Sequence, residues 1–336
     1  MTTRTRFSPS PTGPLHLGGA LSAVANRRRG EWMLLRIDDT DAGRELEGAA
    51  EAIVDDLRWL GLAWEEGPMR QRERVARHRE AAEAVGTPDA KGALRLDRLT
   101  LLRADGSPTY HLASVVDDHD FGITHVVRGA DHRANTELQQ NLARALGFEP
   151  PEYVHHGLLL GEDGKKLSKR NSPVATVADL RSAGIPPAAV RAYLDELGEP
   201  LHDVQLDLPR VRRLAIEAIA SLSDEELAAA AGAPVELVPA LRGARDLNEA
   251  RENARAILEP APAKVPESAR PMLERFVELR ADDLDGRSIV RELKAVGGDL
   301  KSLRLALMGA ERGPELWAVI AALPRDEALR RARAAL

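Results

Sequence analysis

The sequence predicts an α/β fold in which a parallel sheet with crossover helices precedes an all-helical C-terminal region. From Met1 to about Gly198, short β-rich runs alternate with helical periods. From Val211 to Leu336 the pattern is helical and rich in Ala, Leu, Arg and Glu. With 336 residues, 43% of them hydrophobic, the chain can bury the cores of two domains.

The first predicted elements are a strand over Thr3–Phe7, a helix from Gly18 to about Arg28 and a strand over Trp32–Ile37. The helix that follows has one apolar face and is closed by Gly61. Its apolar residues are Ala49, Ile53, Leu57 and Leu60. A further helix is expected from about Arg70 to Val85.

Two more strands are predicted, over Leu99–Arg103 and Ile123–Val127, with Asp105-Gly106 as a turn signal between them. The segment between Gly86 and the first of these strands has an ordinary loop length. A helix marked by Leu138, Leu142 and Ala145 then ends at Gly147. We therefore assign residues 1–198 to one α/β domain.

Residues 199–336 are expected to form helices only. Ser223-Asp224-Glu225-Glu226 has the pattern of a capping box and predicts a helix start. The proline-rich run Glu259–Pro266 interrupts the helical pattern, so we expect a linker over 259–271. No repeat of fixed period is present, which disfavours a solenoid.

Composition excludes several classes of function. The chain has no cysteine, which excludes disulfides, thiolate zinc sites and a cysteine nucleophile. It shows no signal peptide and no long apolar run, so we expect a cytoplasmic protein that does not enter a membrane. The net charge of -6 argues against nonspecific coating of nucleic acid. The basic clusters Arg27–Arg29 and Arg330–Arg333 are expected to be solvated helix ends.

The run from Arg6 to Gly19 predicts a nucleotide pocket. A strand leads into a loop stiffened by proline and glycine, and Gly18 and Gly19 open the next helix. Backbone N–H groups at a helix start are unpaired and carry partial positive charge, so phosphate can bind there. A second loop, Gly161–Arg170, carries four cations within six residues and could bring Lys166 and Lys169 onto a triphosphate.

These two loops, with HLGG and KLSKR, resemble the signatures of class I aminoacyl-tRNA synthetases. The flanking motifs are similar to those of bacterial glutamate–tRNA ligases, in the same order along most of the chain. They are RFSPSPTGPLHLGG, LLRIDDTD, WLGLAWEEGP, RQRERV, GSPTYHLASVVDDHDFGITHVVRG, LLLGEDGKKLSKR and LRLALMGAERGPEL. The resemblance implies a Rossmann-like catalytic domain followed by helices resembling an anticodon-binding domain.

The resemblance also implies a two-step reaction. Glutamate attacks the α-phosphorus of ATP, bound with Mg²⁺, and the 3′ end of tRNA(Glu) then takes the glutamyl group. His16, Lys166 and Lys169 are the implied catalytic residues, which stabilise charge on the phosphates. The implied ATP-binding residues are Pro11, Gly13, His16, Gly18, Gly19, Lys166, Ser168 and Lys169.

Glutamate recognition is carried over position by position. Arg6 and Arg128 match arginines that face the substrate carboxylates in the family. Arginine suits this role because a guanidinium and a carboxylate pair through two parallel hydrogen bonds. Asp38 stands where a glutamate usually holds the substrate ammonium. The implied glutamate-binding residues are Arg6, Ser8, Ser10, Asp38, Tyr110, Ser114 and Arg128. No zinc is expected, and we expect a monomer.

The chain departs from the family pattern at Ser114, which replaces a usual asparagine, and at His132, which replaces a tryptophan. Both changes loosen the expected specificity for glutamate. The larger departure lies near residues 87–98, where the family carries a long insertion that grips the tRNA acceptor stem and this chain keeps about a dozen residues.

The acceptor therefore remains open. The alternatives are a reduced paralogue that glutamylates a queuosine base of tRNA or a non-tRNA carrier, and a noncatalytic module that binds RNA or protein. A dinucleotide-dependent oxidoreductase is disfavoured because no Gly-x-Gly-x-x-Gly run follows the first strand.

Overall fold

The computed structural model describes residues 2–41, 43–168, 171–282 and 284–336. The chain forms two compact units. The N-terminal unit comprises Met1–Ser182 with Val190–Leu208, and the C-terminal unit comprises Ala183–Ala189 with Pro209–Leu336. Within the described ranges no helix is both long enough and apolar enough to cross a membrane.

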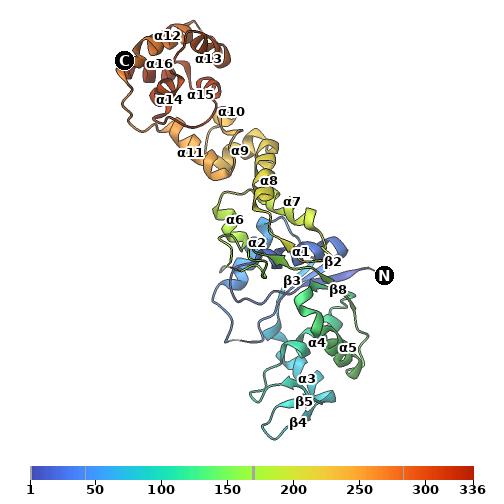
Figure 1. Ribbon diagram of the computed structural model, residues 1–336. Coiled ribbons are helices and arrows are strands. Elements are labelled where there is room, and N and C mark those ends of the chain that lie inside the picture. The colour runs from blue at the N-terminus through green and yellow to red at the C-terminus, as the bar shows by residue number, and fades with distance from the viewer. Residues whose placement is uncertain (1, 42, 169–170, 283) are drawn as a thin grey trace. The chain divides into compact units, whose positions relative to one another are not determined.

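Parallel strands form the centre of the N-terminal unit (Figure 1). Strands β1 (Arg4–Phe7), β2 (Trp32–Ile37) and β3 (Glu66–Arg70) pair in the order β1-β2-β3. Strands β7 (His125–Gly129) and β8 (Glu152–His156) form a second parallel pair. The N–H of Thr124 donates to the Arg4 carbonyl at 2.9 Å, so the start of β7 lies beside β1. The parallel sheet predicted from the alternating pattern is confirmed.

Helix α1 (Leu17–Arg29) is fastened to this sheet by Asn26. The Asn26 side-chain amide donates to the Val127 carbonyl at 2.9 Å, and the Thr5 hydroxyl donates to the Asn26 carbonyl at 3.0 Å. Because these bonds join one helix to two strands, they fix the C-terminal part of α1 against β1 and β7. The basic helix end is tied down rather than merely solvated, since Arg27 pairs with Glu65 and Arg29 with Glu199.

The segment expected to be a plain loop near 87–98 is not one. Strands β4 (Thr87–Pro88), β5 (Leu94–Leu96) and β6 (Leu99–Leu102) form a small antiparallel sheet. The Asp89 carboxylate accepts from the backbone N–H groups of residues 91 and 93, which closes the turn between β4 and β5. The sheet packs beside α3 and α4 around buried Leu101.

The other elements of this part of the chain confirm some predicted bounds and correct others. The helix expected from Arg70 starts at Val75, because Arg70 pairs with β2 and a 3-10 turn follows it. The strand expected from Ile123 starts at His125, because Ile123 closes the preceding helix through a bond to the Asp118 carbonyl. The remaining bounds are α2 Ala49–Trp59, η1 Gln71–Arg74, α3 Val75–Val85, α4 Tyr110–Asp120, η2 Ala130–Asn135, α5 Thr136–Ala145, β9 Leu159–Leu160, α6 Val177–Ser182, α7 Pro187–Leu197 and β10 Val204–Gln205.

Helices and 3-10 turns are the only secondary structure among the described residues of the C-terminal unit (Figure 1). The expectation of helices only from residue 199 is wrong at its start, because strand β10 (Val204–Gln205) pairs with β9. Its core includes Phe276, Leu293, Leu303 and Ile320, all fully buried. The capping box at Ser223 is present in full. The helices are α8 Leu208–Ser221, α9 Asp224–Ala231, α10 Val238–Leu241, α11 Leu247–Leu258, α12 Arg270–Ala281, α13 Gly286–Ala295, α14 Leu300–Met308, α15 Leu316–Ala322 and α16 Arg325–Ala334, with 3-10 turns η3 Val235–Leu237 and η4 Glu267–Ala269.

Candidate functional site

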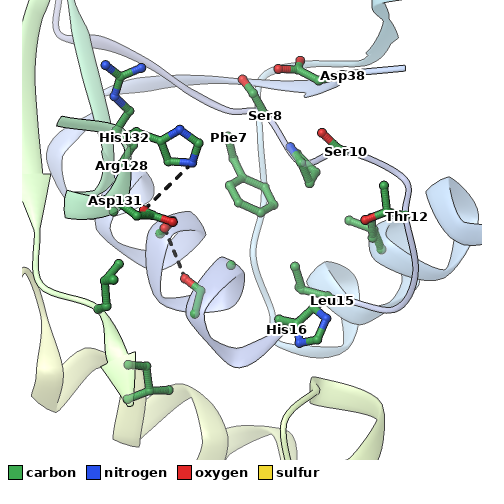
Figure 2. Close-up of a pocket in the computed structure, with 18 of the residues that line it drawn as sticks. Phe7, Ser8, Ser10, Thr12, Leu15, His16, Asp38, Arg128, Asp131 and His132 are labelled. Carbon is green, nitrogen blue, oxygen red and sulfur yellow. Dashed lines mark hydrogen bonds and ion pairs between the residues drawn. The ribbon is translucent and has the colours of Figure 1, made fainter. Parts of the chain in front are cut away.

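A cavity of about 660 Å³ lies in the N-terminal unit. It is bounded by the loop after β1, the start of α1, the ends of β7 and β8, and residues 166–168 of the lysine-rich loop, which we call the basic loop. Ser8, Ser10 and Thr12 follow one wall down to His16, and Arg128 and His132 stand on the opposite wall (Figure 2). Twelve of the predicted site residues line it: Arg6, Ser8, Ser10, Gly13, His16, Gly18, Gly19, Asp38, Tyr110, Arg128, Lys166 and Ser168.

The start of α1 can receive phosphate. Gly18 and Gly19 lie in the first turn, which contains no acidic residue. A Cβ added at Gly18 would meet no atom within 4 Å, so the backbone there is open to a ligand. The His16 side chain makes no capping hydrogen bond to the helix, which leaves the imidazole available. These features fit the phosphates of a nucleotide.

The basic loop brings Lys166 to the cavity, where its Nζ lies 2.5 Å from an Asp131 carboxylate oxygen. Burial opposes ionisation of Asp131, but the hydrogen bond and charge of Lys166 outweigh it and lower the Asp131 pKa. The Lys166 ammonium is largely exposed, and exposed ion pairs are weak. Lys166 can therefore leave Asp131 and pair with a phosphate at little cost. Lys169, the other implied catalytic lysine, lies outside the described residues.

Two arginines, Arg6 in the cavity wall and Arg36 behind it, are paired with carboxylates. Asp118 bridges them, because its carboxylate lies 3.2 Å from Arg6 Nε and 2.8 Å from Arg36 Nη1. Arg36 is fully buried and also holds Asp38, with Nε 2.7 Å from one carboxylate oxygen and Nη2 3.3 Å from the other. Burial raises the pKa of Asp38, although Arg36 opposes the rise. The contacts of Arg6 with Asp118 use its Nε, so its terminal nitrogens can meet a ligand in the cavity.

Arg128 differs, because its partners are neutral. Its Nη1 donates to the Gln139 amide oxygen at 2.7 Å, its Nη2 to the Thr136 hydroxyl at 3.0 Å and its Nε to His155 at 3.4 Å. The guanidinium lies 4.9 Å from the centre of the Tyr153 ring and is only 6% exposed. Burial lowers the Arg128 pKa, which records the cost of a cation with no carboxylate beside it.

Among the described residues, the hydrogen-bond partners of Arg128 are therefore neutral. Arg6 and Arg36 contact Asp118, Arg36 also contacts Asp38, and the charge of Asp117 acts on Arg36 as well. A ligand that carries a carboxylate would supply the negative charge that the partners of Arg128 lack.

Two predicted residues do not line the cavity. Pro11 is buried in the loop, where its carbonyl accepts from the N–H of Leu46. Ser114 is 1% exposed and lies behind the site, 3.4 Å from Arg36 Nη2. Ser114 can therefore contact substrate only through Arg36.

Sequence reasoning missed several residues of the site. Asp131, Ser22 and His156 line the cavity, and Arg36 and Asp118 stand behind it. His156 donates from Nδ1 to the Gly157 carbonyl at 2.8 Å, which leaves its Nε2 to accept from the Ser22 hydroxyl at 2.9 Å. Asp131 lies three residues after Arg128, so an acidic residue close to a predicted ligand was the available signal.

Within the described ranges, no three His, Cys, Asp or Glu side chains are grouped to hold a metal ion. Mg²⁺ typically binds through few carboxylates together with substrate phosphates, so an ion would enter with the nucleotide.

The family described as tRNA synthetases class I (E and Q), catalytic domain, matches residues 2–85 and 89–207. Glutamate–tRNA ligase 2 of Paracoccus denitrificans is 32% identical over 462 residues, covering 97% of each chain. Glutamate–tRNA ligase 1 of Methylorubrum extorquens is 33% identical over 466 residues, covering 98% of each chain. The alignment of 462 positions exceeds the 336 residues of this chain by 126, so at least that many positions have no counterpart here.

A solved structure shows the same fold. The glutamate tRNA ligase of Elizabethkingia meningosepticum, in complex with its amino acid, aligns with a TM-score of 0.77 and 21% identity, over 100% of this chain and 99% of that one. The match to the family over the whole N-terminal half, and the full-length similarity to the Paracoccus protein, agree with the α/β fold and the helical C-terminal half described above. The chain belongs to the family of class I glutamate and glutamine tRNA synthetases.

Proposed function

We propose that this protein uses ATP to convert L-glutamate to glutamyl-adenylate and transfers the glutamyl group to the 3′ end of tRNA(Glu). The observation that carries the amino-acid assignment is Arg128, a buried cation whose partners in the cavity wall are neutral. A carboxylate on the substrate side chain would supply the missing charge. Arg6, with Nη1 and Nη2 free of Asp118, would bind a second carboxylate oxygen.

The phosphates would lie at the other end of the cavity, at Gly18, Gly19 and His16. Glutamate's α-carboxylate oxygen attacks the α-phosphorus, and pyrophosphate leaves with Mg²⁺. Little covalent chemistry falls to the protein in this displacement, which depends on alignment and on neutralising charge. His16, Lys166 and Lys169 are the residues proposed to stabilise the phosphates.

Asp38 is proposed to hold the substrate ammonium. Both its oxygens already accept from Arg36, but each carboxylate oxygen has a second lone pair. Tyr110, at the start of α4, lines the same end of the cavity. Further parts of the proposal are a cytoplasmic location and a monomeric state.

Exchange of labelled pyrophosphate into ATP tests the first step. We expect exchange that depends on glutamate and is far weaker with glutamine or aspartate, measured with and without tRNA. If glutamate promotes no exchange under either condition, the proposal is wrong. The variant Arg128→Met should lose most of the glutamate-dependent exchange, because it removes the cation proposed to bind the substrate carboxylate.

The acceptor needs its own test, because the missing 126 positions favour a second candidate, a reduced enzyme that glutamylates another acceptor. The protein is incubated with labelled glutamate, ATP and total tRNA, with or without prior periodate oxidation. Label that is lost on mild alkaline treatment, and does not form on oxidised tRNA, marks a 3′-terminal ester. Label that forms after oxidation would favour a base or a non-tRNA carrier instead.

A further inference from the structure

The three arginines in and behind the cavity wall differ in the charge of their partners. Arg6 and Arg36 contact the carboxylate of Asp118, whereas Arg128 is held by Gln139, Thr136 and His155. We propose that Gln139 is a specificity-determining residue, which holds Arg128 in place without neutralising it and so reserves that charge for the side-chain carboxylate of the substrate. This inference depends on the proposed activation of glutamate.

Gln139 is placed to do this. It lies on α5, is 2% exposed and accepts from Arg128 Nη1 at 2.7 Å, within the range of a strong hydrogen bond. An amide oxygen orients a guanidinium as a carboxylate oxygen does, but it adds no charge. Glutamine and glutamate have nearly the same shape, so the charge at this point depends on one atom of the side chain.

The other two partners of Arg128 are also neutral. Thr136 carries a hydroxyl, which accepts from Arg128 Nη2. Burial and the neighbouring Arg128 lower the pKa of His155 to about 4, so its ring is uncharged near pH 7 and can accept at Nε2. Three acceptors thus fix the guanidinium while its charge stays uncompensated.

The geometry also says which carboxylate Arg128 would meet. The reacting α-carboxylate must lie beside the phosphates, at His16 and the start of α1. Arg128 stands on the opposite wall (Figure 2), so the group that reaches it is the far end of the substrate side chain. A ligand without a carboxylate would leave the buried guanidinium without a charged partner, so the site should discriminate strongly against it.

Replacing Gln139 by glutamate tests the inference. Gln139→Glu places a carboxylate where the amide oxygen was, so Arg128 is neutralised before substrate arrives. We expect KM for glutamate in pyrophosphate exchange to rise by about tenfold or more, roughly 1.4 kcal/mol, while KM for ATP stays within about twofold. The preference for glutamate over glutamine should fall by a similar factor.

Two controls separate charge from shape and from folding. Gln139→Met removes the hydrogen bond without adding charge, and it should keep the preference for glutamate even if activity drops. Gln140→Glu makes the identical change one residue along α5, about 100° around the helix, and should behave as wild type. Calorimetric titration with glutamate and a thermal melt accompany each variant, so that loss of binding is distinguished from loss of fold.

If Gln139→Glu keeps the wild-type KM and preference, or if Gln140→Glu shifts them equally, the role assigned to Gln139 is wrong. That result differs from failure of the proposed function, in which the wild-type protein itself shows no glutamate-dependent exchange.

Discussion

Within the part of the chain that the structure describes, the Lys166 ammonium is paired with the Asp131 carboxylate in an exposed ion pair. Such a pair contributes little to stability, so removing the lysine should affect chemistry rather than folding. We expect Lys166→Ala to lower kcat for pyrophosphate exchange by roughly 10²-fold, the usual effect of losing one group that stabilises a charged transition state.

KM for glutamate should change little in this variant, because Lys166 lies at the phosphate end of the cavity. Lys165→Ala removes the neighbouring exposed lysine, which does not line the cavity, and serves as the matched control. Equal losses in both variants would contradict a specific role for Lys166.

A second residue-level prediction concerns pH. Burial and the charge of Arg128 lower the pKa of His155 in the folded state to about 4, whereas an unfolded histidine titrates near 6.5. Between these values the unfolded chain binds more protons, so the free energy of unfolding should fall as pH drops from about 6.5 to 4.

Urea unfolding of the N-terminal unit at several pH values measures that slope. His155→Gln, which keeps an acceptor but does not titrate, should flatten part of it. Burial also lowers the pKa values of His111 and His132, so those two residues contribute to the slope that remains. An unchanged slope in His155→Gln would refute the assignment to His155.

The residues that sequence alone brings together are those inside short motifs. His16, Gly18 and Gly19 are neighbours in one loop and helix start, so local rules were enough to predict them as a phosphate site. The Arg6–Asp118 pair joins residues 112 positions apart, and no local pattern indicates it. The sequence therefore brings together residues of one loop, whereas only the fold shows the charged partner of Arg6.

At the level of elements, one arginine of α16 ties together the ends of two other helices. Arg331 Nη1 donates to the carbonyls of Ile257, in α11, and Leu307, in α14, at 2.7 and 2.6 Å. These carbonyls lie in the last turns of their helices, where backbone acceptors lack helical partners. The sequence interpretation of 330–333 as a solvated helix end is wrong for Arg331, which is 9% exposed.

We expect Arg331→Met to lower the free energy of unfolding of the C-terminal unit by about 2–4 kcal/mol, because it leaves two buried carbonyls unpaired. Arg330→Met is the matched control. Arg330 is largely exposed and pairs with Glu327 at the surface, so its loss should cost much less than that of Arg331. Urea unfolding followed by helical circular dichroism measures both, and similar costs would contradict the capping role.

The sequence predicted elements correctly where the pattern of apolar residues extended over many positions. The strand at Trp32–Ile37 and the helix from Ala49 have the predicted positions, because each carries a continuous buried stripe. Strands β4 and β5 were missed, since two or three residues give no measurable period and the turn depends on one side chain, Asp89. Very short elements depend on contacts that only the folded chain supplies.

For the whole molecule, the proposed function assigns different steps to the two units. The described residues that line the cavity lie between Arg6 and Ser168, inside the N-terminal unit. The C-terminal unit has its own core, in which Phe276 is fully buried. Adenylate formation should therefore be insensitive to damage in that core, whereas charging of tRNA should depend on both units.

Phe276→Ala tests this separation. Removing a buried phenylalanine typically costs about 3–5 kcal/mol, so the unfolding transition of the C-terminal unit should move to lower temperature. At temperatures below that transition, glutamate-dependent pyrophosphate exchange should keep its wild-type kcat and KM. Leu112→Ala, in the N-terminal core, is the reciprocal control and should reduce the thermal stability of exchange instead. If Phe276→Ala abolished exchange while its C-terminal helices remained folded, the two units would be coupled in catalysis, and the glutamate site could not be treated as complete within the first unit.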